Sequence, residues 1–270
     1  RHRRTMPTAA APQEPHVKPY VQVGERTRAL HFNIHEIQSR MQVADPHALD
    51  LDYTRTMMGF LLFQPAPRQL TMIGLGGGSL AKFCHRHLPR TRLRVVEINP
   101  HVVALRDTFH VPPDDDRFTV VLGDGARVVR EDAEPCDVLL VDGYDSQGLP
   151  ARLSSQRFYD DCQAALAPGG VMVANLHTGH RRFEVCVDRI RRSFDDEVLV
   201  VEAADLTNSI VFAFHNRRPG VRRRGPLRAA AGLDPAAVDG LRAELAAVAA
   251  AASRRPRPGT GLPRAAAGVA

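Results

Sequence analysis

The sequence is poor in the features that mark disulfide-bonded and membrane proteins. It has no tryptophan and only four cysteines, Cys84, Cys136, Cys162 and Cys186, with no CxxC pair among them. This spacing argues against a disulfide framework, so we expect reduced thiols and a cytoplasmic protein. No apolar run approaches the roughly 18 residues that a membrane span needs. The arginines near the N-terminus precede no apolar segment of a signal peptide, so no membrane partner is expected.

The positive charge of the chain is concentrated at its two ends. The net charge is +6, but residues 217–270 contain 11 Arg against three acids, for a local charge of +8. Residues 1–18 contribute +3, which leaves −5 for residues 19–216. A mildly acidic central region fits an enzyme for a small molecule better than a surface that reads nucleic acid. No specific nucleic-acid partner is therefore expected.

Changes in composition divide the chain into four segments. Residues 1–18 and 217–270 are rich in Ala, Pro and Arg, and we expect both to be mostly disordered basic tails. A helix at about 235–252 is compatible with the sequence, but we expect its Ala-rich face to bury little. Between the tails, residues 19–62 predict a small β-hairpin and helix unit, and residues 63–216 predict the main domain.

The main domain alternates between strands and helices. Strands are predicted at 69–74, 92–97, 118–122, 137–141, 171–175, 197–202 and 209–214, and helices at 79–87, 100–109, 125–131, 154–166 and 180–193. The strand at 137–141 is dense in Val and Leu, which is typical of a central parallel strand. This alternation predicts an α/β fold with a Rossmann-like, doubly wound and mostly parallel seven-stranded sheet.

Glycines or acids follow four consecutive predicted strands. Residues 74–78 (Gly-Leu-Gly-Gly-Gly) follow a strand and open a helix, a context in which the backbone lies close to a nucleoside. Glu97 ends the next strand, about 20 residues further on, where a carboxylate accepts hydrogen bonds from ribose hydroxyls. Asp124 and Asp142 end the third and fourth strands. Ligands of such sheets bind outside the carboxyl ends of the strands, so these residues predict a nucleoside site.

Residues 20–215 resemble the spermidine synthase (polyamine aminopropyltransferase) family, a relative of the class I methyltransferases. The resemblance is carried by the glycine turn, Val96-Glu97-Ile98, Gly123-Asp124-Gly125, and Asp142-x-x-Asp145 followed by Pro150; Gln38 and Tyr53-x-x-x-Met57 match the segment before the main domain more loosely. It implies transfer of an aminopropyl group from decarboxylated S-adenosylmethionine to a polyamine. It also implies a small-molecule amine as partner and a homodimer.

The resemblance implies a role for each matching residue. The donor nucleoside would be bound by Gly74, Gly76, Gly77, Gly78, Glu97, Ile98, Asp124, Gly125 and Asp142. Asp142 would also deprotonate the attacking amine, which needs a free lone pair to react. Asp145, Tyr144 and Gln38 would contact the amine substrate.

Two positions depart from the family pattern. The glycine turn of polyamine synthases usually includes an acid that binds the ammonium of decarboxylated S-adenosylmethionine, and Gly77 stands in its place. Without that acid, the site would also admit intact S-adenosylmethionine, whose carboxylate an acid would repel. Arg40 lies where the family often has acids, and it would oppose a polyamine if it pointed inward. An S-adenosylmethionine-dependent methyltransferase on the same fold is therefore an alternative.

Other classes of function have less support. A non-catalytic nucleoside-binding relative of the fold is a second alternative. A nicotinamide dehydrogenase is disfavoured, because Ser79 replaces the third glycine of its fingerprint. Asp124 and Asp142 would also have no role in such an enzyme. No metal site is predicted: His31 and His35 lack the Glu of an HExxH motif, and His85 and His87 lie on different faces of a helix.

Overall fold

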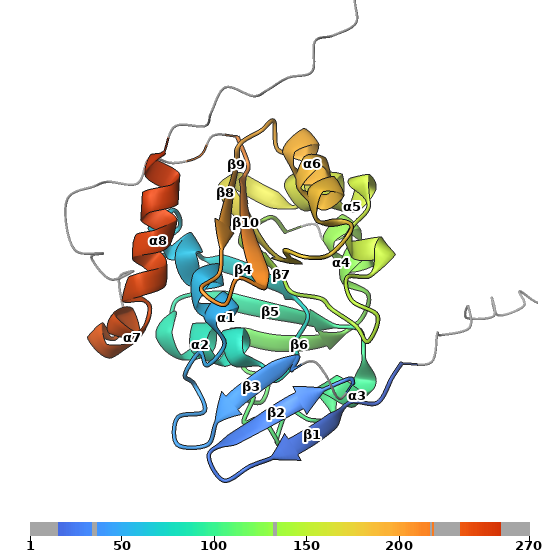
Figure 1. Cartoon of the computed structure of the whole chain (residues 1–270), viewed down its shortest axis with the longest axis vertical. Coiled ribbons are helices and arrows are strands. Elements are labelled where there is room, and N and C mark those ends of the chain that lie inside the picture. The colour runs from blue at the N-terminus through green and yellow to red at the C-terminus, as the bar shows by residue number, and fades with distance from the viewer. Residues whose placement is uncertain (1–15, 34–36, 132–133, 217, 219–232, 255–270) are drawn as a thin grey trace, which may run out of the picture.

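The computed structural model describes residues 16–33, 37–131, 134–216, 218 and 233–254. Within them, a seven-stranded sheet has the order β6-β5-β4-β7-β8-β10-β9, and a separate three-stranded sheet has the order β1-β2-β3 (Figure 1). The strands are β1 (Tyr20–Val23), β2 (Thr27–His31), β3 (Ser39–Gln42), β4 (Gln69–Ile73), β5 (Arg92–Glu97), β6 (Phe118–Leu122), β7 (Cys136–Val141), β8 (Leu166–His177), β9 (Val198–Glu202) and β10 (Asn208–Phe214). The predicted α/β fold with a seven-stranded sheet is confirmed.

The large sheet is parallel from β6 to β8, and β10 then runs antiparallel to both β8 and β9. Strand β8 begins earlier than predicted. The expected turn at 168–170 lies inside it, as an irregularity where the pairing register with β7 shifts between Cys136 and Val138. The small sheet is antiparallel, and β3 adds a third strand to the predicted hairpin.

Helices cover both faces of the large sheet (Figure 1). They are α1 (Asp52–Met57), the 3-10 helix η1 (Met58–Leu62), α2 (Ser79–His87), α3 (Pro100–Val103), α4 (Gly125–Glu131), the 3-10 helix η2 (Ala151–Leu153), α5 (Gln156–Ala164), α6 (Phe183–Ser193), α7 (Pro235–Gly240) and α8 (Arg242–Ser253). Side chains alternate along each strand. On β4, Met72 joins the core cluster that includes residues of η1, α2 and α8, and Ile73 joins the cluster that includes α5 and α6.

The helix predicted at 100–109 is shorter than expected. Asn99 caps it as predicted, because its Oδ1 accepts a hydrogen bond from the His101 amide at 3.0 Å and Pro100 takes the first helical position. The α-helical part ends at Val103, and the following turns close with tighter i→i+3 bonds such as Leu105 N to Val102 O.

The expectation that the C-terminal helix buries little is wrong. Helix α8 places Leu245 and Val248 in the core, and Leu241, the residue directly before the helix, is buried with them, so the three follow helical spacings of four and three residues. Its neighbour η1 carries Gly59, where an added Cβ would lie 2.8 Å from Val248 Cγ2. Three larger residues among the alanines are therefore enough to anchor this helix. The expected disorder of residues 1–15, 219–232 and 255–270 concerns parts of the chain outside the described residues.

The contact between α8 and the main domain also includes charged groups. Arg55 of α1 donates a hydrogen bond from Nε to Glu244 of α8 at 2.6 Å and pairs with Asp52. Its NH1 group donates to the backbone oxygen of Leu49 at 2.8 Å. Arg55 therefore ties the C-terminal helix to the helix that carries Tyr53. Over the described ranges, no helix has both the length and the apolar character needed to cross a bilayer.

Candidate functional site

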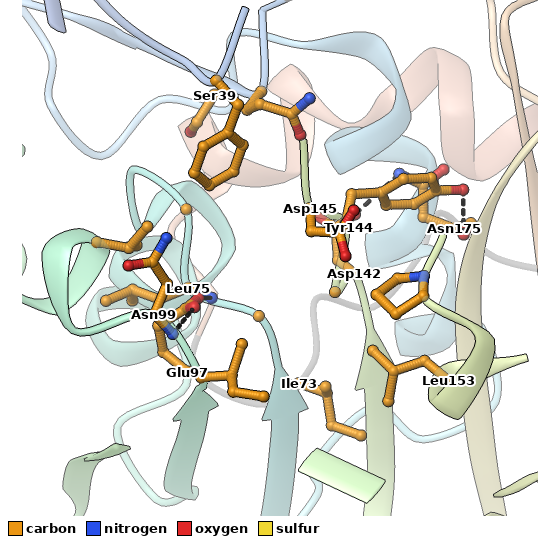
Figure 2. A pocket seen from close by; sticks show the side chains of 18 of the residues that line it. Ser39, Ile73, Leu75, Glu97, Asn99, Asp142, Tyr144, Asp145, Leu153 and Asn175 are labelled. Carbon is orange, nitrogen blue, oxygen red and sulfur yellow. Dashed lines mark hydrogen bonds between the residues drawn. The ribbon is translucent and has the colours of Figure 1, made fainter. Parts of the chain in front are cut away.

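A cavity of about 750 Å³ opens at the carboxyl ends of the central strands. The strands β6, β5, β4 and β7 are consecutive neighbours in the sheet, so the residues that follow them meet at one edge. The predicted site residues that line this cavity are Gln38, Gly74, Gly76, Glu97, Ile98, Asp124, Gly125, Asp142, Tyr144 and Asp145. Figure 2 shows Glu97 on one side of the cavity and Asp142 with Tyr144 on the other.

The glycines of the turn have different roles. Gly74 and Gly76 line the cavity and have φ angles of +94° and +53°, which favour glycine. A side chain on Gly74 would overlap the backbone carbonyl of Asp142, so this glycine lets β4 and β7 end close together. The open side of Gly78 faces Val111. Close backbone packing therefore explains part of the glycine pattern that the sequence analysis assigned to nucleoside binding.

Gly77 is packed against two side chains. A Cβ at this position would lie 2.7 Å from Ser39 Oγ and 2.9 Å from Phe109 Cδ1. Ser39 belongs to β3, lines the cavity and lies 3.4 Å from the hydroxyl of Ser79 on α2. The place of the expected acid is thus occupied by neutral neighbours.

Glu97 is held in place by the backbone around it. Its Oε2 accepts a hydrogen bond from the amide of Leu75, and its Oε1 accepts one from the amide of Asn99, each at 2.8 Å. The side chain is buried, and burial raises the pKa of the carboxyl despite these backbone hydrogen bonds. These backbone amides fix the carboxylate at the edge of the cavity.

Asp124 makes a structural hydrogen bond and also lines the cavity. Its Oδ1 accepts a hydrogen bond from the Ala126 amide at 3.0 Å, at the start of α4. Its Oδ2 lies 3.3 Å from NH1 of Arg152 on η2, which also lines the cavity. Next to it, a Cβ at Gly125 would lie 2.5 Å from Ile73 Cγ2. Asp124 therefore stabilises the turn into α4 and also lines the cavity.

Asp142 receives one hydrogen bond on each carboxylate oxygen. Asn175 Nδ2 donates to Oδ1 at 2.9 Å, and the Tyr53 hydroxyl donates to Oδ2 at 3.1 Å. Burial raises the pKa of Asp142, whereas these two hydrogen bonds favour its charged form and act in the opposite direction. Figure 2 shows Asp142 facing the cavity between Tyr144 and the floor formed by Ile73 and Leu153. The carboxylate is therefore oriented, and its pKa lies closer to neutrality than that of an exposed aspartate.

Tyr53 and Asn175 are site residues for which the sequence analysis proposed no role. Tyr53 was noted only as a loose match to the family, and Asn175 only as the last residue of a predicted strand. Their separations from Asp142 along the chain are 89 and 33 residues. A polar residue at the carboxyl end of the strand next to β7 was the available signal for Asn175.

Tyr144 and Asp145, which were predicted to contact the amine, lie on the same side of the cavity as Asp142 (Figure 2), and Gln38 also lines the cavity. The Tyr144 hydroxyl donates to the Asn175 backbone oxygen at 3.1 Å and accepts from the His177 amide at 3.0 Å. Asp145 is exposed, and its Oδ1 accepts from the Gln147 amide at 2.7 Å. Arg40 pairs with Asp50, so it does not place its charge against the cavity as the sequence analysis had considered.

The cavity is suited to a cationic pair of substrates. Its described lining contains four carboxylates, those of Glu97, Asp124, Asp142 and Asp145, against one arginine, Arg152. Glu97 ends β5, Asp124 follows β6 and the other two acids follow β7, so the acids divide between two sides of the cavity. The part of the chain that the structure describes contains no group of three or more His, Cys, Asp or Glu residues able to hold a metal ion.

Comparisons with known proteins identify a family to which this chain is similar. Residues 51–185 match the family described as the spermine/spermidine synthase domain. A polyamine aminopropyltransferase of Chromobacterium violaceum is 39% identical over 199 residues, which cover 73% of this chain and 76% of that protein.

Two solved structures are similar in fold. A probable spermidine synthase from Corynebacterium glutamicum has a TM-score of 0.63 at 21% identity, covering 73% of this chain and 76% of that one. Human methyltransferase-like protein 13 in complex with SAH has a TM-score of 0.57 at 23% identity, covering 77% of this chain and 94% of that one. At these identities the two structures support the fold alone.

Proposed function

This chain belongs to the spermine/spermidine synthase family, and we propose that it is a transferase that moves an aminopropyl group from decarboxylated S-adenosylmethionine to a polyamine. The observation that carries the proposal is the pair of acids on opposite sides of one cavity. Glu97 is fixed by two amides where a ribose would bind, and Asp142 is fixed by Tyr53 and Asn175 where an amine would attack. Glu97 ends β5 and Asp142 follows β7, the two strands on either side of β4.

The proposed reaction is a displacement at carbon. The acceptor nitrogen, after loss of a proton to Asp142, attacks the aminopropyl carbon bonded to the sulfonium sulfur. The carbon–sulfur bond breaks, and its electron pair neutralises the sulfur to give methylthioadenosine. Because a sulfonium is a good leaving group, holding the two substrates in line supplies much of the acceleration. Removal of the proton adds a factor typical of general-base catalysis, about 10²–10⁴.

We infer further that the donor nucleoside uses Glu97 at the ribose and Asp124 with Gly125 at the adenine. Gly76 and Ile98 line the same side of the cavity. Tyr144, Asp145 and Gln38 would contact the acceptor amine. A homodimer and a cytoplasmic location stay predictions.

The choice between aminopropyl transfer and methyl transfer depends on which donor the site binds. Ser39 and Phe109 occupy the place of the acid that would bind the donor ammonium, which keeps a methyltransferase using intact S-adenosylmethionine as the second candidate. The test is incubation of the chain with each labelled donor and a series of amines. Methylthioadenosine as the nucleoside product is expected from the decarboxylated donor. Formation of S-adenosylhomocysteine from the intact donor, with no aminopropyl transfer, would reject the proposal.

Two single variants test whether Asp142 is the general base. Asp142→Asn keeps the size of the side chain but removes its basicity, so we expect kcat to fall by about 10²–10⁴ with donor binding retained by calorimetry. Asp145→Asn is the matched variant in the same loop and should chiefly raise KM for the amine. If Asp145→Asn costs more kcat than Asp142→Asn, the two acids have exchanged roles and Asp142 is not the base.

A further inference from the structure

A chain of polar side chains leads from Asp142 through two buried amides of β8 and β10 to a hydroxyl at the surface. Asn175 on β8 donates from Nδ2 to Asp142 Oδ1 at 2.9 Å, and its Oδ1 accepts from Asn208 Nδ2 on β10 at 2.7 Å. The Oδ1 of Asn208 in turn accepts from the Thr207 hydroxyl at 2.8 Å. Asn175 and Asn208 are only 4% and 7% exposed, so water has little access to these amides.

The direction of every bond in this chain follows from its first member. An ionised carboxylate only accepts hydrogen bonds, so Asn175 must turn its NH₂ group to Asp142. Its carbonyl oxygen then faces Asn208, which must donate, and the oxygen of Asn208 faces the Thr207 hydroxyl. Because buried amides without partners are costly, neither amide can turn alone.

We propose that Asn175 and Asn208 are positioning residues that hold the Asp142 carboxylate in place and favour its charged form, which takes the proton from the amine. Asn208 fixes the Asn175 amide so that its NH₂ group faces Oδ1. Protonation of Asp142 weakens Oδ1 as an acceptor of this hydrogen bond, so the bond favours the ionised carboxylate. The inference rests on the proposed function in its use of Asp142 as base.

Other charged groups around Asp142 do not take the place of this chain. The titratable groups that line the same cavity are His16, Tyr53, Glu97, Asp124, Tyr144, Asp145, Arg152, His177 and His180. Among the described residues, Tyr53 contacts Oδ2 and Asn175 contacts Oδ1. Replacing Asn175 therefore removes the side-chain hydrogen bond to Oδ1 and keeps the Tyr53 hydrogen bond to Oδ2.

The experiment compares the pH dependence of kcat/KM for aminopropyl transfer in the wild type, Asn175→Ala and Asn208→Asp. Activity falls as Asp142 is protonated, so a higher pKa moves the acid limb to higher pH. Asn175→Ala removes a hydrogen bond to the charged form, and we expect the limb to move up by about one pH unit. Asn208→Asp can no longer donate to Asn175, which would turn its oxygen toward Asp142 and move the limb in the same direction.

Ser209→Ala is the matched control on the same strand pair. Its hydroxyl lies 3.0 Å from that of Thr178, in a side-chain hydrogen bond of the same strand pair that does not include Asp142. This variant should leave the acid limb in place. Thermal unfolding identifies any variant that does not fold, and Asn208→Ala then replaces Asn208→Asp.

A second readout separates the inference from the proposed function. The ¹³C shift of the Asp142 carboxyl, followed against pH, reports its pKa without turnover. A raised pKa in folded Asn175→Ala and Asn208→Asp, but not in Ser209→Ala, supports the positioning role even if the wild type transfers no aminopropyl group. An unchanged pKa in both folded variants overturns it.

Discussion

At Gly77, packing and the choice of donor depend on the same few atoms. An added methyl group would meet Ser39 Oγ at 2.7 Å and Phe109 Cδ1 at 2.9 Å. We expect Gly77→Ala to lower the free energy of unfolding by about 1–3 kcal/mol, the range typical of overpacked sites. Chemical denaturation with the unfolding midpoint as readout measures this. Gly179→Ala is the control, because nothing lies within 4 Å of an added Cβ there.

The same site shows why an acid cannot simply be restored. Gly77→Asp would need Ser39 or Phe109 to move before its carboxylate reached a ligand. A Gly77→Asp variant as stable as the wild type would show that this packing is not the constraint on position 77.

The site residues that could be predicted from the sequence are those that follow strands. Glu97, Asp124 and Asp142 are each local to a predicted strand, and the sheet order brings strand ends together without further information. Tyr53 could not be assigned in this way, and the only signal for Asn175 was a polar residue near the carboxyl end of its strand. Their contacts with Asp142 depend on how α1 and β8 pack, which no local pattern encodes.

At the scale of elements, α8 shows how few residues suffice to anchor a helix. Leu245 is 2% exposed and Val248 is fully buried. We expect Leu245→Ala to cost about 2–5 kcal/mol of unfolding free energy, because it removes core contacts and leaves a cavity. Arg242→Ala is the control on the same helix, since its ion pair with Asp239 is exposed. Equal stabilities of the two variants would show that α8 is not part of the cooperative core.

The fold was more predictable than its accessory elements. Strand β7 is identified by composition alone, because a central parallel strand is buried on both faces and is therefore a nearly continuous apolar run. The C-terminal helix was underestimated because alanine contributes little to an apolar face, so the spacing of Leu241, Leu245 and Val248 was masked. Strand β3 was not separated from the hairpin because it is only four residues long.

At the scale of the whole molecule, the C-terminal helix and the cavity are linked through α1. Arg55 binds Glu244 of α8, and Tyr53 of the same helix donates to Asp142. A chain ending after Arg218 should therefore unfold at a lower temperature and show reduced transfer activity. A chain ending after Arg254 keeps every contact described above and serves as control. Calorimetric melting of both chains, with activity assays below the melting range, tests whether the C-terminal helices support both stability and activity.

Two outcomes would contradict this link. If the chain ending after Arg218 melts with the control, α7 and α8 contribute nothing to the core. If it melts lower but keeps full activity at low temperature, the helices stabilise the fold without influencing Tyr53.

The backbone contact between Gly74 and Asp142 has a consequence for how such enzymes can be recombined. Because a side chain at 74 would overlap the carbonyl at 142, the two loops share one volume although 68 positions separate them in the chain. A chimera with a crossover between β4 and β7 inherits the loops from different parents and must match them at this point. Libraries that vary the acceptor loop should therefore keep position 74 as glycine and draw both loops from a single parent.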